Sequence, residues 1–234
     1  MIIGKLTLNY FTIMTSNHLK SMKKVILLFF IGTLAAQYPA DSLYRAPNTT
    51  LLKKIFLYPI TKWQQFSYNQ PFLNCQFEPS CSNYGAQAIH SHGAVAGLFM
   101  TSDRIIRCNP NARQYHQFMD GQFHLDGRLM DPISNPSDRA TTKSPIIAAG
   151  LSMIIPGLGR AYAGRTSDGI YGFVITALAI NNGINSIKKE SILSPFQIGL
   201  AITLYGGEIY GAYRTAKYYQ PIYKRLTNSF FFKT

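Results

Sequence analysis

Residues 74–84 read Asn-Cys-Gln-Phe-Glu-Pro-Ser-Cys-Ser-Asn-Tyr and place two of the three cysteines of this 234-residue chain just ahead of a predicted helix. Pro79 cannot lie inside that helix, because proline lacks a backbone N–H and its ring clashes with the preceding turn. Ser82 is of a type that caps helices, and Gly93 is of a type that ends them. We therefore predict a helix from Ser82 to His92.

A second helix is predicted over residues 94–107, and Cys108-Asn109-Pro110 ends it. Arg104 and Arg107 lie near its C-terminus, where the helix dipole favours cations. The residues expected to face inward are Val95, Leu98, Phe99, Ile105 and Ile106. This pattern predicts an all-α fold that begins with a small helical hairpin, has cysteine in its core, and brings Cys81 close to Cys108.

The three cysteines and His92 suggest a zinc site, but their spacing argues against it. Five residues separate Cys75 from Cys81 and 26 separate Cys81 from Cys108, whereas short zinc knuckles have about two to four. A nucleophilic thiol is not indicated either, because the sequence shows no acid that would orient a histidine beside a cysteine and no glycine loop that would form an oxyanion hole. We predict buried thiols, with no metal, no cofactor, no small-molecule substrate and no enzymatic activity. A zinc or thiol protein is the least favoured alternative.

A polar stretch follows the hairpin. His116, Asp120, His124 and Asp126 invite a metal interpretation, but Gly, Asp, Gln and Asn dominate there and no period orders them. We predict a solvated loop within a domain of residues 51–135, followed by a linker at 136–144.

Upstream of the cysteines, residues 37–50 are predicted to be a linker and residues 51–66 a helix bent or broken at Pro59. The apolar positions of that helix fall near helical spacing beside Lys53, Lys54 and Lys62. Such a helix lies on a lipid surface with its lysines at the headgroups, or buries its apolar stripe in its own core. The sequence leaves both alternatives open.

Residues 1–36 resemble a signal peptide. Lys23 and Lys24 precede twelve uncharged residues, 25–36, that end in small side chains. Twelve residues are too few to span a bilayer core of ~30 Å. An uncleaved hydrophobic segment at the membrane interface is the alternative.

Three uncharged stretches occur near the C-terminus, at residues 144–159, 169–187 and 191–207. The first is short and broken at Pro156-Gly157. The second and third are predicted to form a transmembrane helical hairpin within a module of residues 145–213, provided that Glu208 lies near the interface. Gly207 and Gly211 have the spacing that lets helices approach closely.

Charge supports a membrane location. The chain carries a net charge of +13, and only 14% of its residues are charged. Residues 1–36 hold four lysines and no acid, and the tail at 214–234 holds five basic residues and no acid. Cations beside apolar segments are typical of membrane proteins and bind anionic headgroups, whereas the nearly balanced residues 37–143 do not indicate nucleic-acid binding.

The segment of residues 54–110 resembles the YidD family of membrane protein insertion efficiency factors. The resemblance rests on Cys75, Phe77, Pro79, Cys81, Ser82, Tyr84, His92, Gly93, Arg104, Arg107, Cys108, Asn109 and Pro110, and on Asp131-Pro132 further along. Two departures are that Ser80 stands where the family usually has Thr, and that an insertion through His116 and Gly127 separates Asp131 from Cys108.

This resemblance implies a basic, non-enzymatic protein on the cytoplasmic face of the bacterial inner membrane, near the translocon and insertase, that helps nascent membrane proteins enter the bilayer. A second pattern resembles a two-span module found on many bacterial membrane proteins: Pro156, Gly157, Gly159, Tyr162 and Gly164. Two spans place the basic tail and the YidD-like domain in the cytoplasm. Three spans place that domain outside, which would suit an exported, envelope-anchored binding module with a Cys75–Cys81 disulfide.

Overall fold

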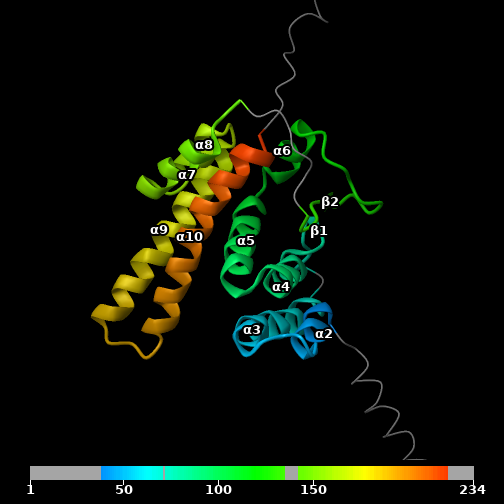
Figure 1. Cartoon of the computed structure of the whole chain (residues 1–234), viewed down its shortest axis with the longest axis vertical. Coiled ribbons are helices and arrows are strands. Elements are labelled where there is room, and N and C mark those ends of the chain that lie inside the picture. Colours follow the sequence, from blue (N-terminus) through cyan, green and yellow to red (C-terminus); the bar gives the residue numbers. More distant parts are fainter. Residues whose placement is uncertain (1–37, 71, 135–141, 221–234) are drawn as a thin grey trace, which may run out of the picture. The chain divides into compact units, whose positions relative to one another are not determined.

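The computed structural model describes residues 38–70, 72–134 and 142–220, so residues 1–36, most of the 136–144 linker and the tail beyond 220 lie outside the described part. The described chain is mostly helical, as predicted, and its elements belong to one unit that begins at Pro39 (Figure 1). Its helices are α2 (Pro39–Arg45), α3 (Leu51–Ser67), α4 (Cys81–His92), α5 (Ala94–Arg107), α6 (Ala112–Phe118), α7 (Pro145–Ile154), α8 (Leu158–Tyr162), α9 (Thr166–Lys188) and α10 (Ser194–Tyr218).

The predicted hairpin is α4 followed by α5. Gly93, with a φ of 88°, ends α4 and starts α5. The capping residue was predicted wrongly: α4 starts one residue earlier, and the Ser80 hydroxyl accepts a hydrogen bond from the Asn83 N–H at 3.3 Å. Ser82 lies inside the helix, where its hydroxyl accepts a bond from the Gln64 side chain instead.

The inward face of α5 was also predicted in part wrongly. Val95 is 61% exposed and Ile105 is 46% exposed, whereas Met100 and Ile106 are buried. Polar residues are buried on α5 as well, namely Ser102, Asp103, Arg104 and Arg107. The reason is that α10 packs against α5, and that Arg214 of α10, Arg160 of α8 and Asp131 pair with the charged residues of that face. A periodicity of apolar residues alone does not indicate such partners.

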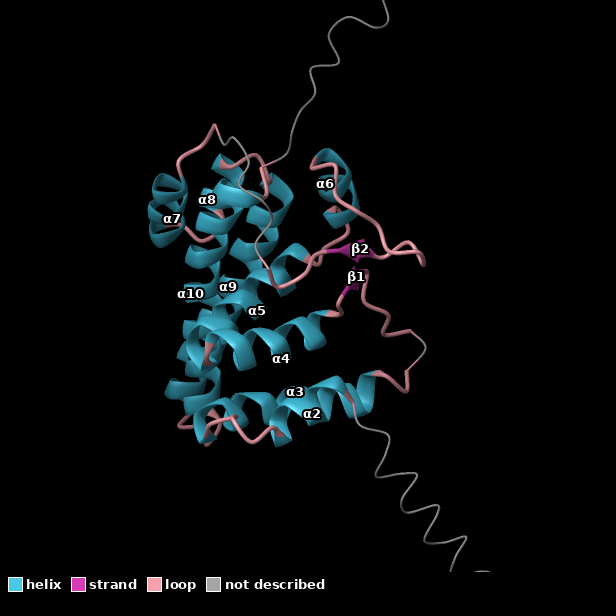
Figure 2. Ribbon diagram, turned by 45° about the vertical axis from the view of Figure 1, so that its right-hand side comes forward, coloured by secondary structure: helices cyan, strands magenta, loops and turns pink. Residues whose placement is uncertain are grey.

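The segment 37–50 is not a simple linker, because it contains α2. Ala40 of α2 packs with Leu57 and Ile89 in a buried cluster, and its N–H donates to the Gln64 side chain at 2.9 Å. The next helix, α3, runs through Pro59 without a break and lies beside α4 in both views (Figure 2). Pro59 is exposed, so its ring meets no neighbouring helix.

A short parallel pair of strands is the departure from an all-helical chain. β1 (Phe77–Glu78) pairs with β2 (Leu129–Met130), with Phe77 opposite Leu129. This pairing closes the insertion after Cys108 and brings Asp131 back to the hairpin. His116, predicted in a solvated loop, instead lies on α6 and is buried, because its ring contacts Phe123 and bonds the Gln122 carbonyl oxygen.

Among the C-terminal helices, a break at Pro156-Gly157 separates α7 from α8, as predicted. Gly157 has a φ of 89°, and Gly164 has a φ of 90°. Gly159 allows close packing, since a Cβ there would lie 1.9 Å from the Ala148 carbonyl oxygen. The Tyr162 hydroxyl accepts a bond from the Ser144 N–H.

The predicted transmembrane hairpin is supported in its first helix. Among the described residues, α9 alone is long and apolar enough to cross a membrane. The other arm, α10, is longer but carries Glu208 and Arg214 in its second half. Its glycines let it approach α5, because a Cβ at Gly207 would lie 2.4 Å from the Ser102 side chain. The C-terminal helices therefore pack against the hairpin of α4 and α5 (Figures 1 and 2).

We predict that Gly97→Ala destabilises the protein by about 1–3 kcal/mol, the usual cost of overpacking a tight core. A Cβ at Gly97 would lie 2.4 Å from the Ile89 Cα, so α4 and α5 would have to separate. Urea unfolding in detergent, followed by circular dichroism, measures the change. Gly150→Ala on α7 is the control, since no atom lies within 4 Å of the added group; an equal loss there would contradict the packing argument.

Candidate functional site

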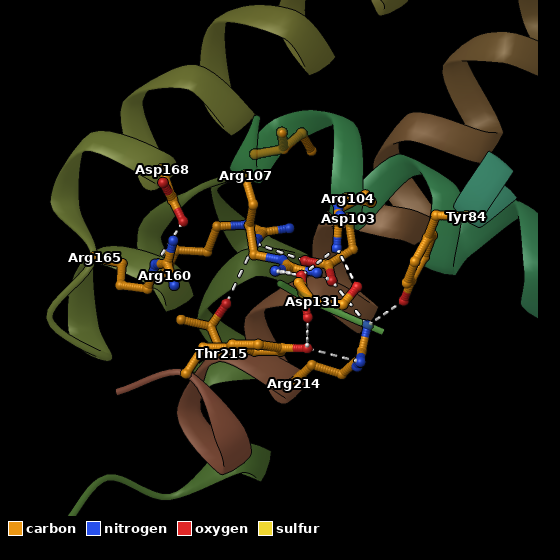
Figure 3. A network of polar contacts seen from close by, with 12 residues as sticks. Tyr84, Asp103, Arg104, Arg107, Asp131, Arg160, Arg165, Asp168, Arg214 and Thr215 are labelled. Carbon is orange, nitrogen blue, oxygen red and sulfur yellow. Dashed lines mark hydrogen bonds and ion pairs between the residues drawn. The ribbon is translucent and has the colours of Figure 1, made fainter. Parts of the chain in front are cut away.

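A buried ionic network joins the hairpin to the C-terminal helices. Asp103 of α5 is fully buried and accepts hydrogen bonds from three arginines: Arg107 at 3.2 Å, Arg160 at 2.9 Å and Arg214 at 3.1 Å. Arg160 comes from α8 and Arg214 from α10 (Figure 3). One carboxylate therefore binds side chains from three separate helices.

A second carboxylate, Asp131, completes the network from the side of β2. Arg104 and Arg107 both pair with it, and the Tyr219 hydroxyl donates to it at 3.1 Å. Arg104 and Arg107 lie in the last turn of α5, as predicted, but the sequence did not indicate their burial. Both side chains are buried, because the strand pair delivers Asp131 to them.

Glu208, which the sequence prediction places near a membrane interface, has its partner inside the protein. It is fully buried on α10 and accepts bonds from the Arg160 Nε at 2.9 and 3.0 Å. Asp168 of α9 pairs with Arg165 at 2.6 Å and accepts a bond from the Asn109 amide at 2.7 Å. Single charges inside otherwise apolar stretches signal such buried pairs in a sequence, but they do not name the partner.

Several of the sequence-predicted residues surround this network. The Arg104 guanidinium lies 3.9 Å from the Phe77 ring and 4.8 Å from the Tyr84 ring, and it donates to the Pro79 carbonyl oxygen. Buried Tyr84 accepts a bond from Arg214 through its hydroxyl. His92, in contrast, is exposed at the far end of α4 and is not part of the network.

The electrostatics keep both aspartates ionised. Burial alone would raise the pKa of Asp103, but the charges of Arg107, Arg160 and Arg214 outweigh it and hold that pKa below the ordinary value. In the same way, Arg107 and Arg104 outweigh burial and lower the pKa of Asp131 to about 2. Carboxylates held this way bind guanidinium groups and do not exchange protons near neutral pH, so the network is suited to holding helices together.

The three cysteines come together at a second place, as the hairpin predicted for Cys81 and Cys108. Their sulfur atoms all lie within 4.8 Å of one another, and those of Cys75 and Cys81 are 3.5 Å apart. All three are free thiols and half-buried, so they are more open than predicted. Hydrogen bonds from the Cys108 and Cys81 thiols lower the pKa of Cys75.

A groove of about 1290 Å³ opens beside these cysteines. Apolar residues of α3 and of the segment before β1 form one wall, among them Ile60, Trp63, Phe72 and Leu73. Arg128 and Asp126 lie at its polar edge, paired with each other at 2.7 Å. Its lining is thus suited to an apolar segment more than to a charged small molecule.

The helix α3 presents its apolar residues outward. Its exposed face carries Leu51, Leu52, Ile55, Tyr58, Trp63 and Phe66, each at least 50% exposed. Its opposite, buried face carries Leu57 together with three polar residues: Thr61, Gln64 and Ser67. Of the predicted apolar stripe, Phe56 and Ile60 pack against the core cluster around Leu57. The remaining members, Leu51, Leu52, Ile55 and Trp63, are exposed, so the stripe is buried in the protein's own core only in part.

The fold and the site define a helical protein with outward apolar helices. Comparisons with known proteins indicate its family. A family model described as "Putative membrane protein insertion efficiency factor" matches residues 52–119. Proteins with the same description occur in an Exiguobacterium species and in Amoebophilus asiaticus. They are 42% identical over 59 and 62 residues, which is 25% and 26% of this chain and 66% and 83% of theirs.

No solved structure matches the chain. The coverage of the Amoebophilus relative shows that the chain belongs to the YidD family. The match ends before Asp131, Arg160, Glu208 and Arg214, so the buried network lies partly outside the segment shared with these relatives.

Asp103→Asn is expected to destabilise the protein by about 3–5 kcal/mol, because it removes a buried charge that three guanidinium groups share. Arg107 and Arg160 keep their pairs with Asp131 and Glu208, whereas Arg214 loses its ion pair with Asp103. Chemical unfolding in detergent measures this loss. Asp126→Asn is the matched control, since Asp126 is exposed in its pairs with Arg128 and His124; it should leave stability nearly unchanged. Equal effects of the two variants would show that the network does not hold the helices.

Acid should destabilise the protein in two stages. Burial lowers the pKa of His116. As the pH falls, His116 therefore binds a proton in the unfolded chain before it does so in the folded chain, and stability begins to fall below about pH 6.5. Asp103 and Asp131 have lowered pKa values, so their contribution is complete above about pH 4 and is lost as the pH falls toward 2. Thermal unfolding between pH 7 and pH 3 tests this. His116→Gln should remove the first stage only.

Proposed function

We propose that this chain is a non-enzymatic, membrane-bound factor that assists the insertion of integral membrane proteins into the bacterial inner membrane, next to the translocon and insertase. The domain built on α3, α4 and α5 then lies on the cytoplasmic side. Its family membership supports the general role. The outward apolar face of α3 is the observation that carries the proposal.

Large apolar side chains in one exposed patch mark a surface that something else covers. The exposed face of α3 carries six large apolar side chains, so contact of this face with lipid or with a nascent apolar segment is favourable. Burial of such area is worth about 25 cal/mol per Å². Lys62 lies on the same face, with its ammonium 5.6 Å from the Tyr58 ring, where it would reach anionic headgroups.

The C-terminal helices support a stable attachment to the bilayer. The outward residues of α9 include Ile170, Phe173, Val174, Leu178, Ile184 and Ile187, and those of α10 include Phe196, Leu200 and Ile202. Such surfaces are costly in water and favourable in lipid. In this proposal, α9 and the first half of α10 enter the membrane as a hairpin.

Contacts at the ends of that hairpin support the proposed sidedness. The first turn of α9 bonds to Asn109 through Asp168, and the last turns of α10 bond to Tyr84 through Arg214. Since α9 starts and α10 ends at the same domain, an even number of membrane crossings between these two points is favoured. The basic residues at 214–234 then keep that domain in the cytoplasm.

The groove beside the cysteines supplies a place for a client. It shares Trp63 and Ile60 with α3, so a nascent apolar segment that leaves the groove would meet the exposed face of α3 and then lipid. Such a pathway needs brief binding and no reacting group, in keeping with a factor that speeds insertion.

We expect cells that carry the double variant Leu52→Glu and Ile55→Glu to insert inner-membrane clients as slowly as cells that lack the gene, because the two charges make the α3 face unfavourable in lipid. Crosslinking of pulse-labelled nascent spans to the insertase measures insertion. Leu125→Glu is the matched control, since this leucine is fully exposed on the loop before β2 and is not part of α3. Normal insertion by the double variant, with equal protein levels, would overturn the proposal.

A further inference from the structure

Three thiols from three separate segments meet at one end of the hairpin. Cys75 lies before β1, Cys81 is the first residue of α4, and Cys108 directly follows α5. We propose that these three cysteines form a zinc site with three thiolate ligands and a fourth position that opens into the neighbouring groove.

The distances suit such a site. Sulfur atoms bound at about 2.3 Å around a tetrahedral zinc ion lie about 3.8 Å apart. The closest pair here, Cys75 and Cys81, is 3.5 Å apart, and none of the three sulfur atoms is more than 4.8 Å from another. Small side-chain rotations therefore bring all three to one ion without movement of the helices.

The tertiary structure removes the objection from spacing. Zinc knuckles need short intervals because a single turn supplies both ligands. In this fold, α4 and α5 run out and back, so the start of α4 and the end of α5 meet despite the 26 residues between Cys81 and Cys108. Long sequence separation does not prevent a shared site when a hairpin closes it.

The surroundings favour thiolates. The Cys81 N–H donates to the Cys75 sulfur at 3.3 Å, and the Gln76 amide donates to the Cys108 sulfur at 3.6 Å. Donors of this kind orient ligands and stabilise their charge. Cys81 also begins a twelve-residue helix, whose N-terminal dipole favours a negative sulfur. Binding of Zn²⁺ releases the thiol protons and leaves three zinc–sulfur bonds.

His92 does not supply the fourth ligand that the sequence suggested. It ends the same helix that Cys81 begins, which places it about 16 Å away at 1.5 Å per residue. Within the described residues, no other His, Cys, Asp or Glu joins the group. All three cysteines line the groove, so a water molecule or an incoming donor takes the remaining position.

The test uses the full chain, purified in detergent under anaerobic reducing conditions. We expect about one zinc per chain by elemental analysis, and a thiolate-to-metal charge-transfer band with intense visible bands when cobalt replaces zinc. Cys81→Ser and Cys108→Ser should each lose the stoichiometric zinc and that band. His92→Gln, which changes a candidate ligand outside the cluster, should retain both.

The cobalt spectrum of the unaltered chain keeps the test informative if a serine variant fails to fold. A chain with three titratable thiols and no thiolate band would overturn the proposal. So would retention of zinc by Cys81→Ser, or a Cys75–Cys81 disulfide in a second preparation that is isolated without reductant. Client insertion is not a readout here, so failure of the zinc site leaves the proposed function standing.

Discussion

The carboxylate of Asp103 is the interaction on which the arrangement of helices depends. It lies in a dry interior and binds arginines from α5, α8 and α10. Charges withdrawn from water are costly unless their partners are close and well oriented. These buried ion pairs therefore contribute mainly to specificity. All three arginines reach the Asp103 carboxylate in one arrangement of the helices, and a shifted register would leave a buried cation without a partner.

Small residues make that arrangement sterically possible. A Cβ at Gly211 would lie 1.9 Å from the Arg160 guanidinium, and one at Gly172 would lie 2.5 Å from the Glu208 carboxylate. Side chains there would fill the space that the charges occupy. Packing and electrostatics are thus a single constraint in this protein, and the glycines of α9 and α10 belong to the network as much as its arginines do.

The sequence predicted the local structure well and the long-range partners poorly. The bounds of α5, the break at Pro156-Gly157 and the meeting of Cys81 with Cys108 follow from local rules, because proline, glycine and apolar spacing act over a few residues. The burial of Arg104 and Glu208 was not predicted, because their partners, Asp131 and Arg160, are 27 and 48 residues away. Helix α2 was missed because the prolines and polar residues of that segment resembled a linker.

Because β1 pairs with β2, the position of Asp131 does not depend on the length of the insertion. Since Leu129 is fixed opposite Phe77, the exposed part of the loop between α6 and β2, around Leu125, can lengthen or shorten at a small entropic cost that grows only with the logarithm of loop length. That part of the loop is accordingly free to diversify, and a lineage could remodel the outer contour of the domain while the Asp131 carboxylate keeps its place.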